Sequence, residues 1–176
     1  MFKNASLLVL VIIAAACSTG PSRTVSEIPI DLNEKKGEVV NNKYIIYQMM
    51  TRLFGNTNTT NAFRGTLEEN GVGTFEDITV KALEGLKELG VTHVWYTGVI
   101  EHMTMVDQTL LGIPLDESDV IKGRAGSPYA IKDYYDVNPF LAVDPNNRMQ
   151  EFEALVQRTH NQGLKVLIDF VPNDVA

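Results

Sequence analysis

Three short apolar runs alternate with two amphipathic segments, and this alternation restricts the chain to the α/β fold class. The runs have the length and content of buried strands and span residues 44–51, 92–99 and 165–171. Helical spacing of apolar side chains predicts one helix from Thr74 to Gly90 and another from Asp144 to Gly163. This β-α-β-α-β order implies parallel strands joined by right-handed crossovers.

The links differ in length at the two ends of the predicted strands. The helix-to-strand links are minimal, whereas about 22 residues follow the first strand and about 45 follow the second, against a usual ~2–6. In α/β barrels the loops after the strands build the active face. A doubly wound sheet would use the same end, but Arg52–Gly55 lacks the glycine-rich phosphate-binding pattern. We therefore expect a binding or catalytic face at the carboxyl ends of the strands.

The composition is that of a globular protein with an acidic balance. The 176 residues include 15 Lys or Arg and 22 Asp or Glu, for a net charge of -7. No Lys/Arg cluster offsets this charge, so we expect no nucleic-acid partner. The single cysteine cannot form an internal disulfide, and no Cys/His grouping indicates a structural zinc site.

The first 16 residues have the pattern of a secretory signal peptide. Lys3 precedes an apolar run from Leu7 to Ala16, which is shorter than the ~20 residues of a membrane-spanning helix. The segment Ala14–Cys17 resembles a bacterial lipobox, so we expect Cys17 to be lipidated and residues 17–42 to tether the domain. This predicts a secreted protein anchored to a bacterial envelope membrane, periplasmic or at the cell surface. The alternative is an ordinary signal that leaves Cys17 as a free thiol.

Four segments resemble glycoside hydrolase family thirteen, the alpha-amylase family. They are SPYAIKDYYDVNP (127–139), DFVPNDVA (169–176), IIYQMMTRLFGN (45–56) and HVWYTGVIEH (93–102). The first resembles the family's Tyr-x-x-x-Asp-Tyr loop, and the second its Asp-x-x-x-Asn-His region. The resemblance implies that residues 43–176 are the N-terminal portion of a (β/α)8 TIM barrel, an incomplete barrel with the first three strands and two helices.

The resemblance also implies roles for individual residues. Tyr129 matches the tyrosine that stacks on the sugar, although a tyrosine packed on the barrel rim is the alternative. Asp169 matches the aspartate that orders the top of the barrel, and Asp133 is expected to order its loop. Asn173 matches a calcium ligand of many members, which makes calcium the implied cofactor. Asp174 replaces a sugar-binding histidine, and its carboxylate can only accept hydrogen bonds from sugar hydroxyls.

Family members cleave glycosidic bonds with carboxylates from the fourth, fifth and seventh barrel strands. We expect none of these in residues 1–176, so no catalytic residue is assigned. The resulting hypothesis is an N-terminal fragment of a secreted, retaining hydrolase of alpha-glucans or maltooligosaccharides, inactive alone. One alternative is a non-catalytic glucan-binding surface lipoprotein. Another is complementation by a separate chain that supplies the remaining strands.

Overall fold

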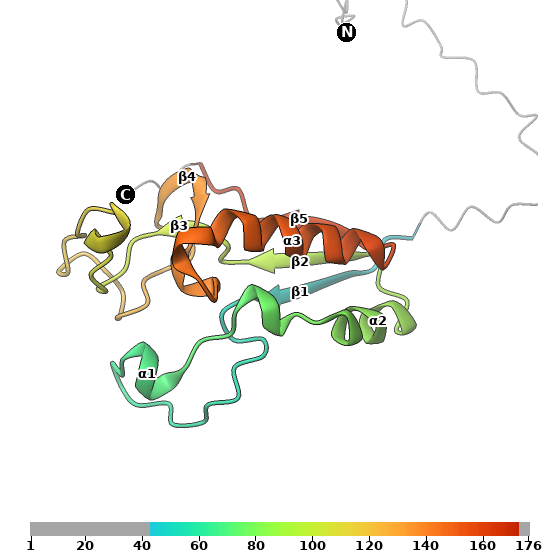
Figure 1. The fold of residues 1–176 in the computed structure, drawn as a ribbon, viewed down its shortest axis with the longest axis horizontal. Coiled ribbons are helices and arrows are strands. Elements are labelled where there is room, and N and C mark those ends of the chain that lie inside the picture. The colour runs from blue at the N-terminus through green and yellow to red at the C-terminus, as the bar shows by residue number, and fades with distance from the viewer. Residues whose placement is uncertain (1–42, 173–176) are drawn as a thin grey trace, which may run out of the picture. The chain divides into compact units, whose positions relative to one another are not determined.

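The computed structural model describes residues 43–172, so Cys17, Asn173 and Asp174 lie outside the described residues. A parallel sheet has the order β1-β2-β5 (Figure 1). Its strands are β1 (Ile46–Met50), β2 (His93–Thr97) and β5 (Lys165–Ile168). In the register, Tyr47 pairs with Val94, and Val94 pairs with Val166. The predicted parallel arrangement of three strands is confirmed.

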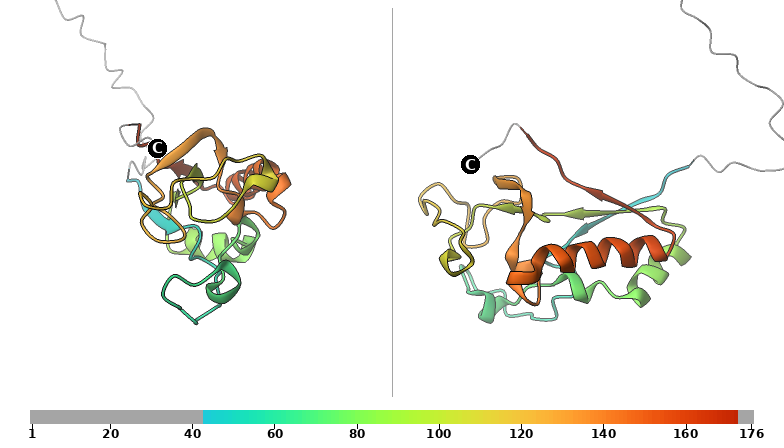
Figure 2. Two further views of the ribbon diagram at one scale, coloured as in Figure 1. Left: turned by 90° about the vertical axis from the view of Figure 1, so that its left-hand side faces the viewer. Right: turned by 45° about the horizontal axis from the view of Figure 1, so that its top comes forward.

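Helices α2 (Val80–Glu88) and α3 (Arg148–Asn161) cover one face of this sheet (Figure 2). Val94 and Tyr96 of β2 point to this face and are fully buried among helix side chains such as Leu83 and Leu155. The hydroxyl groups of Tyr96 and Thr159 lie 2.7 Å apart and share a hydrogen bond, which satisfies two polar atoms inside the core. The core therefore lies between the sheet and the two helices.

The first predicted helix is divided in the structure. Thr74 and Asp77 form the expected capping box, but they begin the 3-10 helix η1 (Phe75–Asp77), and α2 starts only after Thr79. The Arg158 guanidinium donates to the carbonyl oxygens of Phe75 and Ile78, at 2.9 and 2.8 Å. These acceptors are thereby engaged by α3, which explains the interruption.

The long segments after β1 and β2 contain secondary structure that the periodicity analysis treated as loop. Strands β3 (Ile100–His102) and β4 (Ile131–Val137) form an antiparallel pair. A short helix, α1 (Leu67–Asn70), follows β1. The other 3-10 turns are η2 (Thr109–Leu111), η3 (Pro139–Leu141) and η4 (Pro145–Asn147). All of these elements lie in the two long strand-to-helix links, where only loop was predicted.

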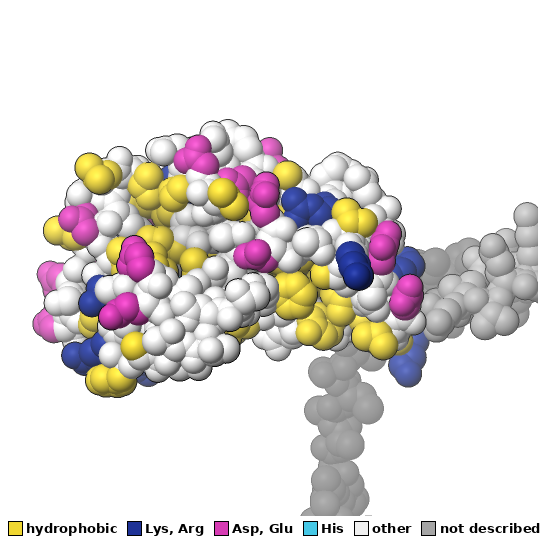
Figure 3. Space-filling model, turned by 60° about the horizontal axis from the view of Figure 1, so that its bottom comes forward, with side chains coloured by type: hydrophobic (Ala, Val, Ile, Leu, Met, Phe, Trp, Pro, Cys, Tyr) yellow, Lys and Arg dark blue, Asp and Glu magenta, His cyan; other side chains and the backbone are white. Residues whose placement is uncertain are grey.

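The sheet face opposite the helices is open in the described residues. Ile46, Gln48 and Leu167 lie on the face opposite Val94 and Tyr96, and all three are exposed, Ile46 at 52% and Leu167 at 37%. On the side of the molecule seen in Figure 3, lysine and arginine side chains are scattered among acidic and hydrophobic ones. Within residues 43–172, no helix combines the length and apolarity needed to cross a membrane.

Candidate functional site

The carboxyl ends of β2 and β5 are joined through Asp169, which directly follows β5. Its Oδ1 accepts a hydrogen bond from the Trp95 indole nitrogen at 2.8 Å, and its Oδ2 accepts one from the Gly98 backbone N–H at 3.3 Å. A carboxylate is suited to this position because it offers acceptors to two separate donors. Asp169 therefore holds the ends of the two strands together.

Gly98 is the point at which a third segment approaches these strand ends. Its φ of +79° favours glycine, and a Cβ at this position would lie 3.2 Å from the Cβ of Pro128 and 3.8 Å from the sulfur of Met50. The segment containing Pro128 and Tyr129 thus passes closely over the end of β2. The absence of a side chain at Gly98 allows this approach.

Tyr129 belongs to that crossing segment, and its side chain is 36% exposed. Its backbone N–H donates to Ser127 Oγ at 3.3 Å, a local contact that shapes the turn before β4. The ring is thus accessible at the end of the sheet where the sequence predicts a binding face. Its stacking on a sugar stays a prediction.

Tyr134 is a residue of this region that the sequence analysis did not single out. Its hydroxyl donates to the Val171 carbonyl at 2.8 Å, and its ring centroid lies 5.3 Å from that of Phe170. It therefore ties β4 to the residues that follow Asp169. Its position next to Asp133 in the resembling motif is the signal that could have identified it.

Asp133 lies on β4, exposed, and its Oδ1 accepts the Tyr135 backbone N–H at 2.8 Å. Glu101, its partner in the register on β3, is 4% exposed. Burial raises the pKa of Glu101, and the negative charges of Asp136 and Asp133 raise it further, against an opposing effect of Lys132. The neutral form of Glu101 is thereby favoured, a feature that the sequence analysis missed.

Beside Glu101, Asp136 accepts from Nε of Arg148 at 2.9 Å and forms an ion pair with the same guanidinium. This contact raises the pKa of Arg148 and joins β4 to the start of α3. His102 is also buried, and burial lowers its pKa although the carbonyls of Ile100 and Ala125 oppose this shift. These groups stabilise the small sheet that carries the Tyr129 segment.

Between residues 43 and 172, no group of three or more His, Cys, Asp or Glu side chains could hold a metal ion. The candidate calcium ligand Asn173 and the candidate sugar contact Asp174 lie beyond this range. The structure brings Asp169 near Trp95 and Gly98, and Gly98 near the Tyr129 segment. This arrangement provides fixed carboxyl ends of β2 and β5 and an accessible aromatic ring in the segment that crosses them.

The chain is similar to several glycoside-acting proteins. A family model described as "Alpha amylase, catalytic domain" matches residues 48–176. Cyclomaltodextrin glucanotransferase of Geobacillus stearothermophilus is 28% identical over 138 residues, covering 73% of this chain and 17% of that enzyme. Trehalose-6-phosphate hydrolase of Bacillus subtilis strain 168 is 28% identical over 131 residues, covering 74% of this chain and 17% of that enzyme. The chain thus spans less than a fifth of the length of these two relatives.

A solved structure with a similar arrangement is the alpha-amylase of Geobacillus thermoleovorans complexed with acarbose. Its TM-score is 0.48 at 24% identity, and the match covers 72% of this chain and 22% of that chain. The family model covers most of the present sequence, including all three parallel strands apart from the start of β1. The chain therefore belongs to the alpha-amylase family of glycoside hydrolases, with its parallel strands forming part of the (β/α) barrel of the catalytic domain.

Proposed function

We propose that the protein cleaves alpha-glucosidic bonds with retention of configuration, and that residues 43–172 supply the sugar-positioning edge of its active site. The observation that carries the proposal is the accessible ring of Tyr129 beside the strand ends joined by Asp169. An aromatic ring suits a sugar because the axial C–H groups of a pyranose present an apolar surface. Alpha-glucans and maltooligosaccharides are the proposed substrates.

Retaining hydrolysis needs a carboxylate nucleophile and a carboxylic acid about 5–5.5 Å apart. Asp169 is a poor candidate for either role, because both of its oxygens already accept hydrogen bonds from the protein. We therefore assign it as a positioning residue. The reacting carboxylates are proposed to come from the fourth, fifth and seventh strands of the barrel, as the family resemblance implies.

Tyr129 provides the direct test of this proposal. In the full-length protein, Tyr129→Ala is expected to lower kcat/KM for maltoheptaose about 2- to 12-fold, because a lost aromatic contact is worth about 0.5–1.5 kcal/mol beyond its area. Tyr129→Phe keeps the ring and is expected to retain most of the stacking. Tyr135→Ala is the matched control, since Tyr135 is 93% exposed on the neighbouring strand. Unchanged kinetics in Tyr129→Ala would refute the assigned role.

The 176-residue chain alone is expected to show no turnover of starch or maltooligosaccharides. An assay of the purified chain tests this directly, and turnover that depends on a residue of this chain would overturn the division of roles. Retention on a starch column without turnover by the full-length protein would instead support the glucan-binding lipoprotein alternative. The two hypotheses therefore predict different outcomes of one pair of assays.

The envelope anchor and the calcium ion are parts of the proposal that concern Cys17, Asn173 and Asp174. Lipidation is tested by mass spectrometry of the mature N-terminus, with Cys17→Ser as the control that should lose the acyl mass. Calcium binding through Asn173 predicts that chelation lowers the melting temperature of the wild type more than that of Asn173→Ala. The proposed sugar contact predicts a higher KM for Asp174→Ala.

A further inference from the structure

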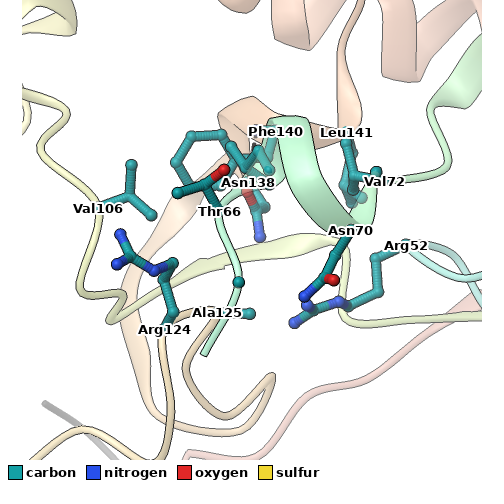
Figure 4. Close-up of a pocket in the computed structure, with 13 residues that line it drawn as sticks. Arg52, Thr66, Asn70, Val72, Val106, Arg124, Ala125, Asn138, Phe140 and Leu141 are labelled. Carbon is teal, nitrogen blue, oxygen red and sulfur yellow. Dashed lines mark hydrogen bonds between the residues drawn. The ribbon is translucent and has the colours of Figure 1, made fainter. Parts of the chain in front are cut away.

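A cavity opens between the segment after β1 and the segments that flank β3 and β4. Its volume is about 60 Å³, and it is open on one side. Figure 4 shows Arg52 on one side of it and Arg124 on the other, with Phe140 and Leu141 along the wall between them. This volume accommodates a group of a few heavy atoms, such as a phosphoryl group, and the open side leaves room for the rest of a larger ligand.

Arg52 is the polar group of this cavity that lacks a partner. It is half-buried, and within residues 43–172 no carboxylate forms an ion pair with it and no acceptor takes a hydrogen bond from its side chain. Burial lowers its pKa, which reflects the unfavourable removal of the cation from water. A half-buried guanidinium normally gains an anion or several acceptors.

The neighbouring amide does not meet this need. Asn70 lies beside the Arg52 guanidinium in Figure 4. Its Oδ1 accepts from the Ala62 backbone N–H at 2.7 Å, and its Nδ2 donates to the Ala62 carbonyl at 3.0 Å. The amide is therefore already engaged by the chain, and Arg52 remains available to a ligand.

The lining carries positive charge without negative charge. Arg124 contributes a second cation, whose Nε donates to the Arg64 carbonyl at 3.2 Å and so leaves the terminal nitrogens available. None of the described lining residues is Asp or Glu, although Glu68, which follows the lining residue Leu67, interacts electrostatically with Arg124. A phosphate monoester carries about -1.5 to -2 at neutral pH, which balances two arginines.

We propose that this cavity binds a small phosphate monoester, with its phosphoryl oxygens paired with Arg52 and Arg124 and its organic part against the apolar wall. Val72, Phe140 and Leu141 belong to that wall. The site is distinct from the Tyr129 segment and does not depend on the proposed glycosidase activity.

The test is isothermal titration of the full-length protein with phenyl phosphate, inorganic phosphate and benzoate. Phenyl phosphate contains no sugar, so it does not report on a glucan site. We expect saturable binding of phenyl phosphate that is tighter than that of the other two probes. No saturable binding, or equal binding of benzoate, would overturn the proposal, and equal binding of inorganic phosphate would overturn the role of the apolar wall.

Variants locate the binding. Arg52→Gln is expected to weaken phenyl phosphate binding about tenfold or more, because a charge-assisted hydrogen bond is lost. Arg64→Gln is the matched control, since Arg64 lies in the same loop with its side chain over the exposed ring of Phe63. In the unmutated protein, phenyl phosphate is expected to slow phenylglyoxal modification of Arg52 but not of Arg64. Equal affinity in Arg52→Gln, or no protection of Arg52, would overturn the assignment.

Discussion

Replacement of Asp169 by asparagine tests the contact that joins β5 to β2. The carboxylate accepts from two donors, the Trp95 indole at 2.8 Å and the Gly98 N–H at 3.3 Å. An asparagine side chain has one oxygen, so its NH2 group must face the second donor. The loss of one charge-assisted hydrogen bond, with an N–H left unpaired, should reduce the free energy of unfolding by about 1.5–3 kcal/mol.

Urea denaturation of the full-length protein measures this change, and a lower midpoint with an unchanged slope is the expected form. Asp119→Asn is the control, because Asp119 is exposed and should change stability by less than about 0.5 kcal/mol. A double-mutant cycle with Trp95→Phe isolates the indole contact, with an expected coupling energy of about 0.5–3 kcal/mol. A decrease below about 0.5 kcal/mol in Asp169→Asn, or zero coupling to Trp95→Phe, would refute the assigned positioning role.

Three further predictions concern the same region. Gly98→Ala should destabilise the protein by about 1–3 kcal/mol in urea denaturation, because φ is +79° and the new Cβ would crowd Pro128; wild-type stability would contradict the close approach. Tyr134→Phe should lose about 0.5–1.5 kcal/mol with its bond to the Val171 carbonyl, and an unchanged denaturation midpoint would count against that bond. The raised pKa of Glu101 means that its contribution to stability is fully present below the unfolded pKa and is lost as the pH rises through the folded pKa. Glu101→Gln should therefore melt at a higher temperature than the wild type at neutral pH, and melting curves across roughly pH 4–8 that match the wild type would exclude this role.

The three strands could be predicted from the sequence because each is a short, continuous apolar run. Their parallel direction could be predicted because a helical segment separates each strand from the next. The run at 44–51 became β1 with slightly shorter bounds, and the run at 165–171 became β5 at Lys165–Ile168. The helix boundary near Ile78 could not be predicted, because the donor that interrupts it is Arg158, 80 residues further along the chain. The predicted end of this helix at Gly90 is close to the observed end of α2 at Glu88.

The small antiparallel sheet was missed for a related reason. Half-buried and exposed residues alternate between the buried ends Ile131 and Val137, but the partner Ile100–His102 is only three residues long and precedes this strand by a long link. Pairing of two such segments depends on how the link folds. The position of Glu101 opposite Asp133 therefore required the paired strands.

The sequence alone determined which residue types were available at the candidate site and at which end of the sheet they would lie. Tyr129 and Asp169 were identified from motifs that each span a few neighbouring residues, and parallel strand order places strand ends at one edge. Only the tertiary structure decided which groups touch. Asp169 accepts a hydrogen bond from Trp95, 74 residues away in the sequence. Among the described residues, Arg52 has no ion-pair partner. Both results depend on how segments distant in the chain pack together.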